Sequence, residues 1–85
     1  MTRYTVVWRK DADDDLAQAW MDAANREDVT SAADQVDIQL KNDPTSKGEE
    51  LHEGLRRLKI PPLSVIFLVE EMDRQVAVVS IRLTN

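Results

Sequence analysis

The chain has 85 residues, a formal charge of −5, no cysteine and a single histidine. This length favours one domain over residues 1–85 with a small core, because domains typically take roughly 100–200 residues and shorter chains bury less of their surface. The lack of cysteine excludes disulfides and thiolate metal sites, and the acidic balance argues against a general polyanion binder. No run approaches the roughly 18 apolar residues of a membrane span, and no signal-peptide pattern opens the chain, so we expect a cytoplasmic protein with no membrane association.

The first half of the sequence predicts one strand and two helices. Residues 4–9 alternate in polarity and are rich in β-branched and aromatic side chains, which favours a short strand. From Asp11, the expected N-cap, to about Asn25, apolar residues recur at helical spacing. A second helix follows, with Asp28 or Thr30 able to cap it. The short connection at residues 26–28 makes the two helices an antiparallel hairpin.

The second half predicts three strands. Residues 45–48 are rich in turn formers, and from about Leu51 the chain returns to extended structure. Pro61 and Pro62 mark a corner, because proline does not fit inside a strand ladder. Residues 63–69 form an almost unbroken apolar run, which is typical of a central strand, and a polar turn leads to the last strand at residues 75–83. Strict alternation gives this last strand one side with Ala77, Val79, Ile81 and Leu83 and another with Val76, Val78, Ser80 and Arg82.

The order of these elements predicts an α+β fold of the type β-α-α-β-β-β. We expect an antiparallel C-terminal meander, to which the N-terminal strand is added, with the helical hairpin packed on one face. The core should combine one face of the meander with Trp8, Leu16, Trp20, Val36 and Leu40. The opposite face of the sheet is then the concave, partly polar surface on which a ligand is expected.

The best functional candidates are basic residues near the middle of the second half. Arg56, Arg57 and Lys59 follow one another with no intervening acid. Exposed guanidinium and ammonium groups on a rigid sheet can hold phosphates or the carboxylates of a partner. The competing interpretation is that they form cross-strand ion pairs with the acids of 49–53 or 70–71.

The other conspicuous residues are interpreted as structural. His52 stands alone, whereas a metal site or a catalytic triad needs several convergent groups. The acids at residues 11–15 diverge on a helix and suit its positive N-terminal end. Trp8 and Trp20 fall on apolar faces and are assigned to the core, and the two glycines to turns or bulges. No cofactor is indicated.

Several short motifs, taken in order and spacing, resemble the RelE/ParE superfamily of type II toxin–antitoxin toxins, which includes plasmid stabilisation proteins. These motifs are Tyr4-Thr5-Val6-Val7-Trp8, Ala12 and Leu16, Leu40 with Asn42-Asp43-Pro44 and Gly48, Gly54-Leu55-Arg56-Arg57-Leu58, and Val65-Ile66-Phe67. The resemblance covers nearly the whole chain. It implies the fold derived above, a bacterial-type toxin and a cognate antitoxin as partner.

The RelE branch of this superfamily implies ribosome-dependent cleavage of mRNA. Its members hold the scissile phosphate with basic residues and often handle a proton with a C-terminal tyrosine or histidine, as RNA cleavage requires. Arg57 and Lys59 fall on family positions that are often basic. Ser64, however, stands where an arginine usually opens the apolar strand, and Thr84 aligns with a further basic position. The chain stops before the terminal tyrosine would appear, and Arg82 is a candidate to fill the vacancy.

Three functions are compatible with these residues. The first is a toxin-like component that acts by binding an antitoxin and, as in the ParE branch, a target such as DNA gyrase. The second is a divergent ribosome-dependent endoribonuclease that uses Arg57, Lys59 and Arg82, helped by Arg56, with His52 as proton acceptor. The third is an inactive stand-alone interaction domain, for which a homodimer is compatible. In each case, the expected binding residues are Arg56, Arg57, Lys59, Ser64 and Arg82.

Overall fold

In the computed structural model, which describes residues 3–84, the chain forms a five-stranded mixed sheet and two helices. The elements in chain order are β1 (Thr5–Trp8), α1 (Lys10–Asp22), α2 (Arg26–Lys41), the 3-10 turn η1 (Pro44–Ser46), β2 (Glu49–His52), β3 (Leu55–Ile60), β4 (Leu63–Glu70) and β5 (Gln75–Leu83). The predicted α+β fold is confirmed. The short edge strand β2 is an addition that the sequence did not indicate separately.

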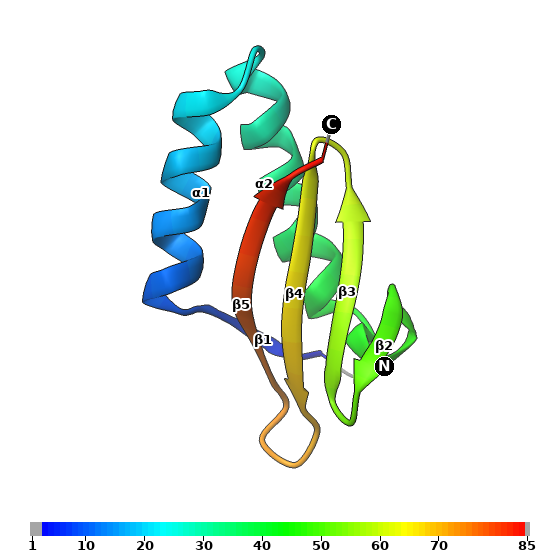
Figure 1. The fold of residues 1–85 in the computed structure, drawn as a ribbon. Coiled ribbons are helices and arrows are strands. Elements are labelled where there is room, and N and C mark those ends of the chain that lie inside the picture. The colour runs from blue at the N-terminus through cyan, green and yellow to red at the C-terminus, as the bar shows by residue number, and fades with distance from the viewer. Residues whose placement is uncertain (1–2, 85) are drawn as a thin grey trace.

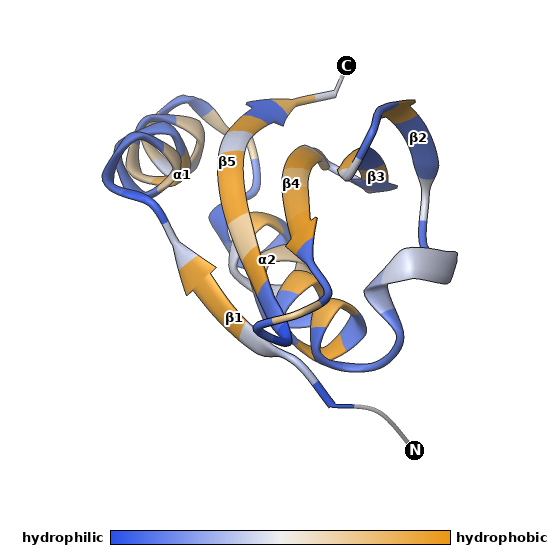
Figure 2. Ribbon diagram, turned by 90° about the horizontal axis from the view of Figure 1, so that it is seen from below, coloured by the Kyte–Doolittle hydropathy of each residue, from blue (hydrophilic) through white to orange (hydrophobic). Residues whose placement is uncertain are grey.

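The sheet has the strand order β1-β5-β4-β3-β2. β3, β4 and β5 form the predicted antiparallel meander, β1 joins β5 in parallel, and β2 pairs antiparallel with β3. In Figure 1, α2 crosses behind the strands while α1 lies beside β5, which leaves the front of the sheet uncovered. Figure 2 shows the sheet curving around α2, so this helix occupies the concave side, and the expectation that the opposite face of the sheet is concave is wrong. We call the other side the open face.

β4 provides the centre of the core. Leu63, Val65 and Phe67 are fully buried toward the helices, while the alternate residues Ser64 and Ile66 lie on the open face and are partly exposed. The helices contribute the buried residues Ala12, Ala19, Val29, Ala32, Val36 and Leu40. The predicted core positions Val36 and Leu40 are therefore confirmed, and Trp8 and Leu16 pack against this core while remaining half-buried.

The assignment of Trp20 to the core is wrong, because this side chain is 42% exposed. α1 turns the small residues Ala12 and Ala19 toward the sheet, and Trp20 lies at the margin of that stripe. The guanidinium carbon of Arg26 lies 4.6 Å from its ring centroid. Trp8 differs, since its indole N–H donates a hydrogen bond to Asp37 Oδ1 at 3.1 Å.

Both helices begin at residues other than those proposed. Arg9, not Asp11, occupies the N-cap of α1. α2 is capped by Asn25, whose side chain accepts hydrogen bonds from two backbone N–H groups at 3.0 and 3.3 Å. Residues 26–28, expected to connect the helices, therefore form the first turn of α2. Among the described residues, no helix is both long and apolar enough to cross a membrane.

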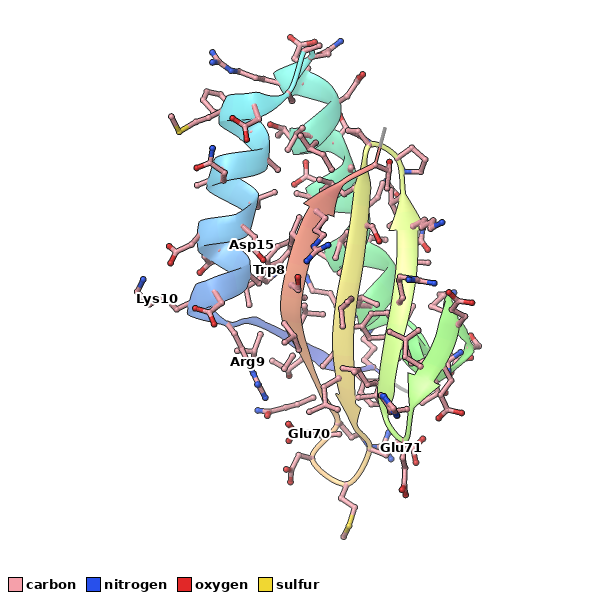
Figure 3. The ribbon with its side chains drawn as sticks, in the orientation of Figure 1. Trp8, Arg9, Lys10, Asp15, Glu70 and Glu71 are labelled. Carbon is pink, nitrogen blue, oxygen red and sulfur yellow. The ribbon has the colours of Figure 1, made fainter. Side chains whose placement is uncertain are left out.

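An aspartate of α1 closes the outer edge of β5. β1 pairs only with residues 75–78 of β5, so the backbone beyond them has no strand neighbour on that side. The carboxylate of Asp15 accepts a hydrogen bond from the backbone N–H of Ile81 at 3.1 Å. Figure 3 shows Asp15 between α1 and β5. The acidic run assigned to the helix terminus thus also satisfies a donor of the sheet.

A β-bulge at Val79 interrupts the alternation of β5. Phe67 pairs with Val78 and Ile66 pairs with Ser80, so Val79 has no opposite residue in β4. The side facing the helices consequently carries Val76, Val78, Ile81 and Leu83. The strict alternation expected from the sequence is wrong, because the inserted residue reverses the faces halfway along the strand. Ser80 and Arg82, which pair with Ile66 and Ser64 of β4, reach the open face.

Gly48→Ala is expected to destabilise the fold by roughly 2 kcal/mol or more, because a backbone collision adds to the strain of left-handed backbone for alanine. Gly48 has φ +65°, and a Cβ there would collide with the carbonyl oxygen of Arg57. Gly54→Ala is the matched control: its φ is +80°, but its Cβ would meet neighbours only at 3.5 Å. Urea denaturation measures both, and an equal loss for the two variants would contradict the steric argument.

Asp15→Ala is expected to lower the free energy of unfolding by about 1–3 kcal/mol, because it leaves the Ile81 N–H without its acceptor. Asp14→Ala is the control, since Asp14 pairs only with the exposed Lys10 and such pairs contribute about 0–1 kcal/mol. Thermal and urea unfolding report both values. A larger loss for Asp14→Ala would show that the sheet edge does not depend on Asp15.

Candidate functional site

Three of the predicted binding residues form one row across the open face. Lys59 is opposite Ser64 in the β3–β4 register, and Ser64 is opposite Arg82 in the β4–β5 register. Opposite residues of this kind have Cβ atoms about 4.5–5.5 Å apart, so both long side chains can meet over the serine. Lys59 and Arg82 are exposed and form no salt bridge within residues 3–84. We call Lys59, Ser64 and Arg82 the cation row.

Arg57 lies on the same face, but its charge is already paired. It stands opposite Ile66, one row away from the cation row. Its guanidinium forms an ion pair with Glu49 of β2, and its Nε is buried without a hydrogen-bond partner. The cross-strand pairing considered from the sequence therefore applies to Arg57, and the open face gains little net charge from it.

Arg56 points to the other side of the sheet. It is opposite the buried Phe67, on the side of the helices. Its Nε donates to the carbonyl oxygen of Lys47 at 2.8 Å and its Nη2 to that of Gly48 at 3.2 Å. Arg56 thus holds the segment that leads into β2. The structure brings together Arg57, Lys59, Ser64 and Arg82, and it separates Arg56 from them.

His52 is remote from the cation row. It is exposed and lies at the hairpin between β2 and β3, opposite Leu55. Lys59 lies four residues beyond Leu55 along β3, which corresponds to about 14 Å at roughly 3.4 Å per residue. This exceeds direct or one-water reach for a proton acceptor. Within residues 3–84, no group of three or more histidine, cysteine, aspartate or glutamate side chains is placed to hold a metal ion.

The cations of the open face border apolar side chains. Leu55 pairs with Leu68 between β3 and β4, and Ile66 lies one row nearer the cation row. All three side chains are partly exposed. Apolar residues with charged residues around them are the usual composition of a protein-binding surface.

The helical hairpin carries a second candidate surface that the sequence reasoning missed. A groove of about 480 Å³ lies between α1 and α2, and every residue lining it comes from these two helices. Its apolar walls include Leu16, Met21, Val29 and Ala33, with Trp20 beside them. The sequence feature that indicates this groove is Trp20 followed by Met21. Together they make the apolar stripe of α1 wider than packing against the sheet requires.

Comparisons with known proteins agree on the fold. No family model matches the chain, and no match is found among curated proteins. A chain of the toxin–antitoxin complex RelBE2 from Mycobacterium tuberculosis has a TM-score of 0.80 at 15% identity, covering 98% of this chain and 93% of that chain. A chain of the chromosomal ParDE system of P. aeruginosa has a TM-score of 0.64 at 18% identity, covering 98% of this chain and 98% of that chain. The isolated E. coli RelE toxin has a TM-score of 0.59 at 14% identity, covering 96% of this chain and 85% of that chain.

The low identities restrict this likeness to the backbone arrangement, since a shared fold does not establish a shared activity. Agreement extends over nearly the whole chain and over both branches of the superfamily. The resemblance found in the sequence motifs is thereby confirmed at the level of structure. The protein has the fold of the RelE/ParE toxins of toxin–antitoxin systems.

Proposed function

We propose that this protein is the toxin-type component of a cytoplasmic toxin–antitoxin module and acts by binding proteins rather than by cutting mRNA. The observation that carries the proposal is the make-up of the open face. Two cations without a salt bridge among residues 3–84 flank Ser64, the guanidinium of Arg57 is neutralised by Glu49, and the neighbouring side chains are apolar. This surface suits a partner segment with carboxylates and apolar side chains.

The same face is poorly equipped for RNA cleavage. Serine carries no charge and one donor, and loss of a preorganised charge-stabilising donor costs on the order of a hundredfold to a thousandfold in rate. The chain's histidine and its tyrosine, the residue types expected to handle the proton, are also remote from the row. His52 lies at the far hairpin, and Tyr4, the chain's one tyrosine, packs against the core on the helix side.

An antitoxin is the first partner that we propose. Two of the similar structures come from toxin–antitoxin systems, RelBE2 and ParDE, and each superposition covers 98% of the present chain. The open face and the hairpin groove provide two surfaces on which such a partner can lie. A gyrase-type cellular target is proposed by analogy with the ParE branch.

A divergent endoribonuclease is the second candidate, and the cation row favours it. Lys59 and Arg82 are exposed, in register and without ion-pair partners among the described residues, so they can hold a phosphate. The proton acceptor would then be a carboxylate of α1 that borders the same pocket as Arg82, such as Asp22, or a group of the substrate or the ribosome. An inactive interaction domain, alone or as a homodimer, is the third.

Expression of the chain alone in a bacterial host is expected to slow growth, and coexpression of its antitoxin to restore it. Because cleavage is not expected, primer extension on ribosome-bound mRNA should show no codon-specific cuts. Leu68→Glu is expected to reduce the growth defect strongly, since it places a charge among the apolar side chains of the open face. Codon-specific cuts that disappear in Arg57→Ala would refute the binding mechanism.

A matched variant on the far side of the molecule controls for folding and expression. Ser31→Glu changes an exposed residue of α2 and should leave the growth effect unchanged. Circular dichroism and soluble yield verify that Leu68→Glu still folds. Growth that is unaffected by the parent chain at high expression would favour the inactive interaction domain.

Ser64→Arg is expected to raise affinity for single-stranded RNA, because it adds a third cation to the row. The log–log salt dependence of binding should steepen by about 0.7, the value for one further phosphate contact on a single strand. Fluorescence anisotropy with a labelled RNA oligonucleotide measures both quantities. Ser31→Arg adds the same charge on exposed α2 surface and should have a smaller effect. A parent chain that already binds as tightly as Ser64→Arg would contradict the proposed role of Ser64.

A further inference from the structure

We propose that the groove of the helical hairpin binds a cationic amphipathic α-helix of a partner protein. The inference rests on the proposed function, because it identifies the segment that a protein-binding toxin of this fold takes on its helical side. It adds the secondary structure of that segment and the sign of its charge.

The shape of the groove fits a helix. The lining residues run along α1 from Asp13 to Met21, about 12 Å or two turns at 1.5 Å per residue. The opposite wall is the antiparallel α2, so the groove is a trough between two helices. A third helix lying in such a trough presents side chains at i, i+3 or i+4 and i+7 to its floor.

The walls of the groove are apolar side chains that the fold leaves exposed. Trp20 is 42% exposed and its neighbour Met21 is 63% exposed. Tryptophan is enriched among residues that dominate binding energy, and methionine adapts its shape to a partner surface. Burial of these two side chains under a partner helix removes apolar area from water, which favours association.

The charge of the hairpin determines the kind of helix. Residues 10–41 contain nine carboxylates and three cations, a formal charge of −6, whereas the remaining 53 residues contain eight cations and seven carboxylates, a formal charge of +1. Both lysines of the hairpin already pair with its own acids. Lys10 bonds Asp14 at 2.8 Å, which raises the pKa of Lys10, and Lys41 lies 3.9 Å from Asp37.

Two of the acids line the groove itself. Asp13 of α1 and Asp34 of α2 face it from opposite walls, and neither forms a salt bridge within residues 3–84. At the other end, Arg26 stacks on Trp20 at 4.6 Å and donates from Nε to the Trp20 carbonyl oxygen at 3.3 Å. The chain's own Arg26 thus already covers one face of Trp20, and the sign of the partner's charge follows from Asp13, Asp34 and the hairpin's formal charge of −6. An acidic helix would bring further carboxylates against this negative charge.

The test uses the full chain and two labelled synthetic peptides of about 18 residues, long enough to form a helix on binding. Both peptides carry the same leucine stripe, one with lysines beside it and the other with glutamates. At low salt, fluorescence anisotropy should show the lysine peptide binding at least about tenfold more tightly, and salt should reduce the difference.

Variants locate the binding to the groove. Trp20→Ala should weaken binding of the lysine peptide at least about tenfold, as expected for a central aromatic contact. The double change Asp13→Asn with Asp34→Asn should abolish most of the preference for lysine over glutamate. Ile38→Ala and Asp11→Asn are controls at exposed positions outside the groove and should leave binding unchanged.

Several results would overturn the inference. They are equal or tighter binding of the glutamate peptide, lysine-peptide binding unchanged by Trp20→Ala, and a homodimer detected by light scattering that Trp20→Ala abolishes. An antitoxin that restores growth and binds Trp20→Ala as it binds the parent chain refutes this inference but supports the proposed function. Groove-dependent binding of the lysine peptide without any growth effect supports the inference and refutes the proposed function.

Discussion

The pairing of β4 with β5 is the interaction on which the rest of the structure depends. β4 buries Leu63, Val65 and Phe67 against the helices, and β5 joins it to β1 on one side and to α1 through Asp15. The bulge at Val79 shifts the alternation of β5 by one residue, and this shift keeps apolar residues on the helix face at both ends of the strand. Without that extra residue, one half of the strand would turn its apolar side chains to water, because a one-residue shift exchanges the faces.

Two neighbouring arginines of β3 contact the segment of the edge strand β2 in different ways. Arg56 turns to the helix side and binds two backbone carbonyls, while Arg57 turns to the open face and pairs with Glu49. Both arginines thereby hold β2 in place. Lys59 and Arg82, on either side of Ser64, are the cations of the open face that form no salt bridge within residues 3–84. The basic residues singled out in the sequence thus divide into two arginines that hold β2 and two cations that lie free on the open face among the described residues.

Charge is divided between the two layers of the molecule. The hairpin carries the negative charge and the remaining residues have a slightly positive formal charge, so the two layers differ in the sign of their charge. The fold of the RelE/ParE toxins is compatible with two such surfaces, because the helices and the open face lie on different sides of the sheet (Figure 1). A single partner that covers both surfaces would need an acidic segment and a basic segment, which is a strong requirement for specificity.

The sequence by itself determined the order of the elements other than β2, the helical hairpin, the central strand and the fold class, because these depend on the local periodicity of apolar residues and on proline and glycine. It also singled out Arg57 and Lys59 as candidate binding residues. Tertiary structure decided the rest. Which face Arg82 takes depends on a bulge that only pairing with β4 reveals, and the exposure of Trp20 depends on how closely alanines let α1 approach the sheet. The pairing of Arg57 with Glu49 likewise depends on β2 folding back along β3, which no local pattern encodes.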